Sequence, residues 1–201
     1  MTTTQTIKPE SNTNSKPRSM MRDRQRPLMR LYKQEPAAAM IQDGARTVAG
    51  ALHRNDPVHG ELLIGTSQPI AVPMSIHSAV GGDHDGPNPG DFLSAALVGC
   101  FDSTMRIIAD RLGVVLEELE VSAKAELDVR GTLCVSPEVQ VGFQRITLSV
   151  KATPAEGTPP QALQMVIAGA EHCCVVLQTL RHGTQVSTVV ADEEHAAGAN
   201  Q

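Results

Sequence analysis

Cys100 and Cys174 are the two residues of this chain whose types and surroundings are best suited to chemistry. They lie 74 residues apart, and each falls in the middle of the apolar face of a predicted helix. Two such thiols can meet if their helices pack against each other. A thiol that forms a sulfenic acid often has a second cysteine nearby to resolve it, so the pair is a candidate redox centre.

Two other interpretations of the cysteines stay open from the residues alone. Free cysteines are most often small, buried hydrophobic residues. A metal site would draw on His172, Cys173, Cys174 and His182, but no Cys-x-x-Cys or His-x-x-x-His pattern places two ligands on one helix face. Cys134 falls in a predicted connection between strands and matches no motif, so we expect it to be incidental.

The sequence argues against several other function classes. It contains no Gly-x-x-x-x-Gly-Lys-Ser/Thr phosphate loop and no Gly-x-Ser-x-Gly nucleophile elbow. Aromatic residues are scarce, with one Tyr, three Phe and no Trp, so a platform for stacking nucleic-acid bases is not expected. The core must therefore be filled by aliphatic residues and Met, and nucleic acid is not the expected partner.

A loop and a helix start precede Cys100. Residues 81–90 contain four glycines and two prolines and are predicted to form a loop. Asp91 then starts a helix that ends near Gly113, in which Gly99 and the alanines leave one side narrow enough for a second helix to approach. Apolar or small residues recur at three- and four-residue steps along it, at Leu93, Leu97, Cys100, Thr104, Ile107 and Ile108.

Cys174 is predicted to lie on a second long helix that begins after residues 158–160. Thr158 can cap this helix, and the two prolines that follow suit its first turn. Its apolar face contains Leu163, Ile167, Ala170, Cys174, Leu177 and Leu180. The β-branched residues 184–190 predict a short final strand, and the polar residues 191–201 are expected to fray.

Two further regions carry strand patterns. Residues 119–129 and 143–150 alternate apolar and polar side chains, with a break at Gln144 and Arg145, and predict two strands with one wet face. Upstream of these strands, Pro73 lies in the apolar segment 70–74 and places that segment at a sheet edge or a bulge. Short apolar segments separated by turn residues predict an antiparallel meander of three strands over residues 47–52, 62–64 and 70–74.

The N-terminal part of the chain differs from the rest in charge. Residues 1–34 hold eight of the 17 Lys and Arg but two of the 22 Asp and Glu, so a basic tail precedes an acidic body. Residues 1–26 have no apolar period and are predicted to be disordered, as a solvated tail, an anchor to an anionic partner or a transit peptide. Residues 27–45 predict two short helices. No apolar run approaches a membrane span, so we expect a soluble, cytoplasmic protein.

Two motifs resemble a known family. Residues 86–100, GPNPGDFLSAALVGC, resemble the helix that carries the reactive thiol in the OsmC/Ohr family of thiol-dependent peroxidases. Residues 170–180, AEHCCVVLQTL, look like the second cysteine motif of that family. The resemblance implies an α+β fold in residues 27–201, with two cysteine-bearing helices packed on a curved, mainly antiparallel sheet. It also implies an intertwined homodimer with active sites at the subunit interface.

The resemblance further implies reduction of hydroperoxides without a metal or an organic cofactor. Cys100 would be the peroxidatic thiol and Cys174 the resolving thiol, and a dithiol, such as a lipoyl-type reductant, would reopen their disulfide. An arginine favours the thiolate in this family, and Arg54 is preferred here over Arg46. Asp91 would act through that arginine or across the dimer interface. The alternative is a non-enzymatic relative that binds an apolar ligand or senses oxidants.

Overall fold

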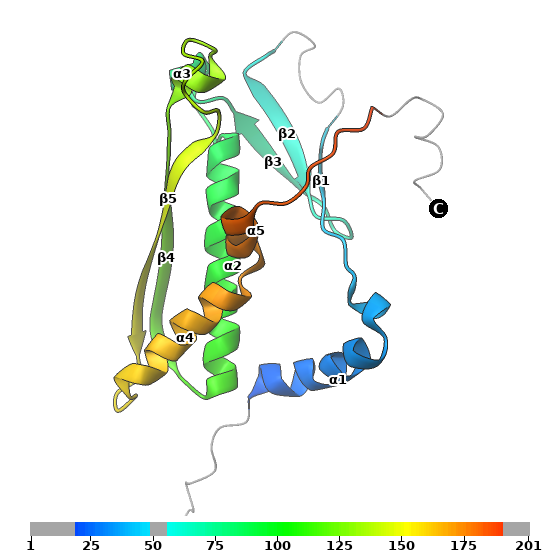
Figure 1. The fold of residues 1–201 in the computed structure, drawn as a ribbon, viewed down its shortest axis with the longest axis vertical. Coiled ribbons are helices and arrows are strands. Elements are labelled where there is room, and N and C mark those ends of the chain that lie inside the picture. Colours follow the sequence, from blue (N-terminus) through cyan, green and yellow to red (C-terminus); the bar gives the residue numbers. More distant parts are fainter. Residues whose placement is uncertain (1–18, 49–55, 191–201) are drawn as a thin grey trace, which may run out of the picture.

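The fold is that of a computed structural model, which describes residues 19–48 and 56–190. One long helix runs through the centre, with a two-stranded sheet on one side and two shorter helices crossing it (Figure 1). A separate three-stranded sheet lies near one end of the long helix. Arg54 and the termini, residues 1–18 and 191–201, lie outside the described residues.

The central helix is α2, Pro89–Leu112, which begins two residues before the predicted start at Asp91 and ends as predicted before Gly113. The side chain of Asn88 accepts hydrogen bonds from Gly90 N and Asp91 N, and the Asp91 carboxylate accepts one from Asn88 N at 2.9 Å. This reciprocal arrangement is a capping box. Gly113 ends the helix with a positive φ of 73°. The buried face repeats every four residues, at Leu97, Phe101, Met105 and Ala109.

The two-stranded sheet consists of β4, Leu116–Leu127, and β5, Phe143–Pro154, paired antiparallel. β5 is longer than its alternating pattern predicts. β4 begins before the predicted 119–129 and ends at Leu127, because Asp128 caps the next helix. The predicted break is a bulge, because the register skips Gln144 between the last two pairs. Apolar side chains on one face of each strand pack against the α2 core, including Leu119, Val121, Ile146, Leu148 and Val150.

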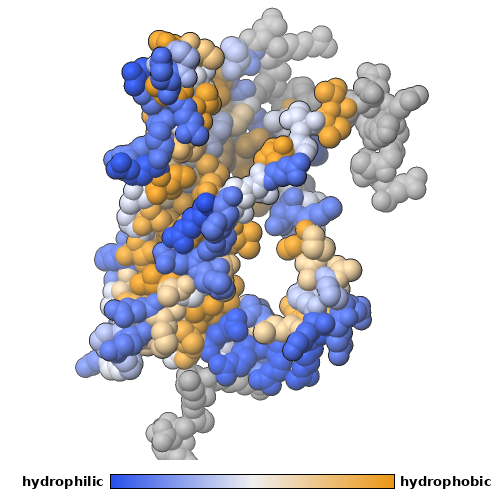
Figure 2. Space-filling model, viewed as in Figure 1, coloured by the Kyte–Doolittle hydropathy of each residue, from blue (hydrophilic) through white to orange (hydrophobic). Residues whose placement is uncertain are grey.

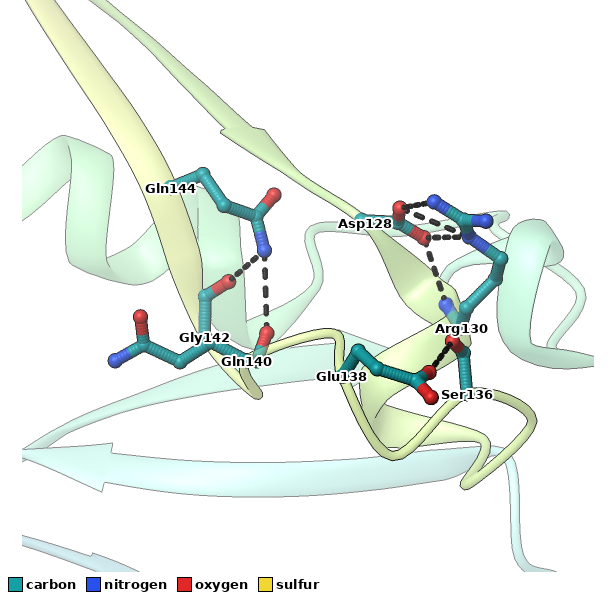
Figure 3. A network of polar contacts seen from close by, with 7 residues as sticks. All are labelled: Asp128, Arg130, Ser136, Glu138, Gln140, Gly142 and Gln144. Atoms are coloured by element: carbon teal, nitrogen blue, oxygen red, sulfur yellow. Dashed lines mark hydrogen bonds and ion pairs between the residues drawn. The ribbon is translucent and has the colours of Figure 1, made fainter.

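The connection between β4 and β5 is held by local polar contacts (Figure 3). It contains the short helix α3, Val129–Thr132. Asp128 accepts hydrogen bonds from the side chain and backbone of Arg130, and these lower the pKa of the Asp128 carboxyl to about 2. The Gln144 amide donates to two backbone carbonyls of the loop. The connection is therefore ordered at both ends.

The predicted second cysteine helix is two helices, α4, Pro160–Cys173, and α5, Val175–His182, bent by 60° at Cys174. The single-helix prediction is wrong at that residue, whose backbone is extended with φ −71° and ψ 110°. The bend lets α4 and α5 both face α2, whereas a straight helix would carry its last turns past it. Thr158 does not cap α4, because Pro159 occupies the N-cap position.

Close packing between α2 and α4 comes from a glycine other than the predicted one. Gly99 has open space where a side chain would begin. A methyl group added at Gly169 of α4 would instead lie 3.0 Å from Cγ2 of Ile108. The small residue that permits the close approach is therefore on α4, where Val166 and Ala170 are also fully buried.

The N-terminal helices are α1, Met20–Gln34, and the 3₁₀ turn η1, Pro36–Ala39. Two short helices are confirmed, but the predicted disorder is wrong for residues 20–26, which are helical. The Ser19 side chain caps α1, and Asp110 of α2 accepts hydrogen bonds from Ser19 Oγ at 2.6 Å and Met21 N at 2.8 Å. These contacts satisfy donors at the helix start and attach α1 to α2.

The three-stranded meander is confirmed, with order β1-β2-β3 and antiparallel pairing. The strands are Ala45–Thr47, His59–Ile64 and Ile70–Ser75, and the 3₁₀ turn η2, Ser78–Val80, follows. The edge position predicted for Pro73 is also confirmed, because β3 pairs on one side only. Residues 49–52 of the first predicted segment lie outside the described residues.

Residues 184–190 do not form the predicted final strand. They run as an exposed, irregular segment after α5, with Val186, Val189 and Val190 each at least 84% exposed. β-Branched residues favour a strand, but a strand also needs a neighbour for its backbone hydrogen bonds. The described part of this single chain supplies no such neighbour.

Helix α2 is long and apolar enough to cross a membrane, by length and composition. The bent pair α4 and α5 also passes if the two helices are counted as one span. The core helix of a folded domain meets the same criteria. Because Leu97, Phe101 and Met105 of α2 are at most 1% exposed against the other elements, we read α2 as such a core helix.

Candidate active site: two thiols in the core

The structure brings Cys100 and Cys174 together. Cys100 lies midway along α2, half-buried, and packs against the buried cluster to which Cys174 belongs. Cys174 is fully buried at the junction of α4 and α5. Helix α2 packs on both of these helices. Helix α2 therefore packs against the α4–α5 junction, and Cys100 and Cys174 lie where these elements meet.

The environment of Cys174 favours its neutral thiol. Burial raises its pKa above the ordinary value, and the adjacent Cys100 thiol raises it further. Backbone N–H groups of Leu177 and Val176, in the first turn of α5, act in the opposite direction but do not cancel the effect. A desolvated thiolate is unfavourable because the charged form loses hydration. Cys174 is therefore a protonated partner beside the more accessible Cys100.

Asp91 does not lie beside Cys100. It occupies the third position of α2 and is engaged in the capping box, with its Oδ2 accepting from the Asn88 amide at 2.6 Å. Nine residues along an α-helix correspond to about 13 Å along the axis. Asp91 therefore positions the start of the helix that carries the thiol.

The described residues place no arginine at the thiols. Arg46 lies on β1 in the three-stranded sheet and is exposed. The preferred candidate, Arg54, lies outside the described residues. Arg106, six residues beyond Cys100 on α2, is engaged with Asp102 at 2.7 Å. An activating arginine for Cys100 is thus not found in the described part of a single chain.

The remaining cysteines are exposed. Cys134 sits in the loop after α3 with a positive φ of 57°, and Cys173 is the last residue of α4. His172 and His182 are also exposed. Within residues 19–48 and 56–190, no three His, Cys, Asp or Glu residues are grouped so that they could hold a metal ion.

An apolar groove lies on the β5 side of the core that contains the thiols, although neither thiol lines it, and the sequence pattern did not predict it. It has a volume of about 830 Å³, between β5 and the helices. Figure 2 shows a band of hydrophobic surface there. Arg181 and Glu171, paired at 3.2 Å, line it as well. Residues of both α5 and β5 line the groove, an arrangement that depends on the bend at Cys174 and that periodicity could not indicate. Its apolar lining includes Leu97, Phe101, Ile146, Leu148, Ile167 and Leu177.

The loop that leads into α2 is tied to the three-stranded sheet through His59. Its Nδ1 lies 2.8 Å from Asp56 Oδ2, and its Nε2 lies 3.3 Å from Asp85 and 3.8 Å from Asp83. Hydrogen bonds to Asp56 and Asp85 raise the pKa of the His59 imidazole above its ordinary value. The imidazole therefore joins β2 to the loop, and protonation of the ring strengthens its contacts with the carboxylates.

We expect the stability contribution of His59 to depend on pH. Because the folded pKa lies above that of the unfolded chain, the contribution is complete below about pH 6.5 and is lost as pH rises through the folded pKa. The difference in unfolding free energy between the wild type and His59→Gln should thus be larger at pH 5.5 than at pH 8.5. Urea unfolding at both pH values measures it, and an equal difference would contradict the assignment.

The comparisons with known proteins agree with this fold. A family model described as OsmC-like protein matches residues 82–189, which include both cysteine helices and the sheet between them. The chain belongs to the OsmC family. A comparison with curated proteins finds no match.

Several solved structures share the fold at low sequence identity. An OsmC-like protein of Vibrio cholerae is 15% identical, with TM-score 0.55, and the match covers 70% of this chain and 94% of that one. An OsmC-like protein of Mycoplasma pneumoniae is 13% identical, with TM-score 0.53 and coverages of 71% and 89%. An organic hydroperoxide resistance protein of Legionella pneumophila is 21% identical, with TM-score 0.51 and coverages of 72% and 92%. The predicted α+β fold is confirmed.

Proposed function

We propose that this protein reduces hydroperoxides with Cys100 and Cys174. The Cys100 thiolate attacks one oxygen of the peroxide O–O bond, which breaks, and the other oxygen leaves and takes a proton to give an alcohol or water. Cys100 becomes a sulfenic acid. The Cys174 thiol then attacks the Cys100 sulfur and releases water, which leaves a Cys100–Cys174 disulfide. A dithiol restores both thiols and is itself oxidised to a disulfide.

The observation that carries this proposal is the contact of the two thiols between α2 and the α4–α5 junction. The raised pKa of the buried Cys174 keeps it a neutral thiol, which suits the resolving role. Cys100 is half-buried, so a peroxide can reach it, which suits the peroxidatic role. The family adds support, because a solved relative from Legionella pneumophila is named an organic hydroperoxide resistance protein.

The activating arginine belongs to the proposal as well. Arg54 remains our candidate for favouring the Cys100 thiolate, with Arg46 as the alternative, since a positive charge beside a thiol lowers its pKa. Asp91 would then orient that arginine, within the chain or across a dimer interface. We also propose a lipoyl-type dithiol as reductant and the cytoplasm as the compartment, because free thiols persist there.

A homodimer would complete the fold. Figure 2 shows an opening through the single chain between α1 and the segment 184–190. The exposed valines of that segment and the open edges of both sheets offer a second copy backbone and side-chain partners. Light scattering after size exclusion should give twice the chain mass of 21.4 kDa. The mass of a single chain at micromolar concentration would contradict the dimer.

The apolar groove suits either an apolar substrate of the proposed enzyme or an apolar ligand of a non-enzymatic binding protein. Its lining from α2, β5 and α5 suits an organic hydroperoxide with a hydrocarbon group. The same lining would suit a non-enzymatic protein that binds an apolar ligand. Catalytic turnover of a hydroperoxide distinguishes the two functions, because a binding protein would not use the thiol pair to consume it.

The proposed function is tested by steady-state consumption of an organic hydroperoxide and of hydrogen peroxide. A lipoyl-type dithiol and a monothiol serve as alternative reductants. We expect turnover with the dithiol and a preference for the organic peroxide, because the groove is apolar. Consumption no faster than that by the same concentration of a free thiol would exclude the enzyme and favour the binding protein.

Formation of the disulfide should accelerate as pH rises. Because the pKa of Cys174 is raised, its attacking thiolate becomes abundant only above the ordinary thiol value of about 8.5. Loss of the Cys100 sulfenic acid after one equivalent of peroxide, followed with a sulfenic-acid probe, should therefore speed up between about pH 7 and pH 10. A rate that is constant over this range would show that Cys174 is not the resolving thiol.

A further inference from the structure

Cys173 and Cys174 are neighbours in sequence but lie in opposite environments. Cys174 is fully buried against Cys100, whereas Cys173 is exposed at the end of α4. The chain leaves helical geometry between them, since α4 ends at Cys173 and the backbone of Cys174 is extended. The residue on the core side is thus Cys174, and the residue on the solvent side is Cys173, at the point where α4 ends.

The burial of Cys174 limits access to the disulfide of the proposed reaction. Thiol–disulfide exchange requires a thiolate to reach a disulfide sulfur, so access controls the rate. The Cys174 sulfur is enclosed between α2, α4 and α5, and Cys100 is itself half-buried. A bulky external dithiol therefore meets this disulfide poorly, while Cys173 is adjacent to it within the same chain.

We propose that Cys173 is a relay thiol that carries the oxidised state from the core to the surface, a role that rests on the proposed function. The Cys173 thiolate, after losing its proton to water, attacks the Cys174 sulfur of the Cys100–Cys174 disulfide. That bond breaks, Cys100 leaves as a thiolate, and a Cys173–Cys174 disulfide forms. The external dithiol then attacks Cys173 and releases Cys174. Its second thiol displaces Cys173 and closes the dithiol's own disulfide, so two electrons pass inward from the reductant to the protein.

A disulfide between adjacent residues suits a transient carrier. Adjacent Cα atoms are about 3.8 Å apart across a trans peptide, below the usual disulfide range of about 4.4–6.8 Å. Such a bond is strained and readily reduced. Backbone adjustment falls on the helix break, where the Cys174 N–H bonds to Ala170 O at 2.9 Å. Formation of the adjacent disulfide therefore requires this last hydrogen bond of α4 to lengthen.

Re-reduction of protein oxidised with diamide tests the relay. Diamide forms the disulfide whether or not the protein reduces peroxides, so failure of the hydroperoxide assay and failure of the relay are distinguishable. We expect a dihydrolipoyl dithiol to reduce the oxidised Cys173→Ser variant about 10-fold more slowly than the wild type, because its disulfide stays in the core. Cys134→Ser, which removes another exposed thiol, should match the wild type. Equal rates for Cys173→Ser and the wild type would overturn the relay.

The relay also leaves a signature in tryptic peptides of the oxidised wild type, quenched in acid and alkylated. Cleavage after Lys and Arg places Cys100 in peptide 55–106 and both adjacent cysteines in peptide 152–181. The relay predicts two species. In the first, the Cys100–Cys174 disulfide links the two peptides. In the second, the Cys173–Cys174 disulfide leaves peptide 152–181 unlinked, unalkylated and two hydrogens lighter, and Cys100 is alkylated. Absence of the second species, or of any disulfide, would overturn the proposal.

Discussion

Replacement of Cys100 by serine is expected to abolish hydroperoxide consumption, reducing kcat/KM to that of the background reaction. A serine hydroxyl is almost entirely protonated at neutral pH and forms no sulfenic acid, so the first step is lost. Replacement of Cys174 by serine should instead permit one turnover, after which Cys100 accumulates as sulfinic acid. Stopped-flow peroxide consumption together with intact-protein mass measures both outcomes.

Cys134→Ser is the matched control for these variants, because it removes an exposed thiol that lies outside the core. It should retain wild-type kinetics. Undiminished consumption by Cys100→Ser would remove Cys100 from the reaction. Repeated turnover by Cys174→Ser, without over-oxidation, would show that Cys174 does not resolve the sulfenic acid.

Replacement of Phe101 by alanine is expected to reduce the free energy of unfolding by about 3–5 kcal/mol. Phe101 is among the largest fully buried side chains, 1% exposed beneath β4 and β5. Its loss would leave a cavity at the contact between α2 and the sheet. Denaturant unfolding followed by circular dichroism measures the change.

The control for Phe101→Ala is Val135→Ala, which truncates a side chain 69% exposed in the loop between β4 and β5. That change should stay within about 0.5 kcal/mol of the wild type. A loss below about 1 kcal/mol for Phe101→Ala would mean that the core is not centred on α2 as described.

The elements around Cys100 could be predicted from sequence because local chemistry fixes them. Asn88 and Asp91 form a capping box, Gly113 provides the left-handed residue at the helix end, and alternation marks both long strands. The bulge at Gln144 is visible as a break in that alternation. Each of these signals acts within a few residues, so a single sequence contains it.

Other features depend on contacts that are distant in sequence. The apolar spacing through Cys174 fits both a straight helix and a broken one, and only packing on α2 selects the bend. Residues 184–190 favour a strand, yet a strand forms only beside a partner. The close-packed glycine is Gly169 rather than Gly99, because the crossing point of the helices decides it. The contact of the two thiols was predicted through family resemblance, since spacing alone left burial and metal binding open.

The central claim is that Cys100 and Cys174 form one redox pair, and disulfide mapping after a single equivalent of organic hydroperoxide tests it most directly. Reduced protein is treated, alkylated in acid and digested with trypsin. The account predicts that peptide 55–106, with Cys100, becomes linked to peptide 152–181, through Cys174. Peroxide left unconsumed, with Cys100 and Cys174 both alkylated, would contradict it.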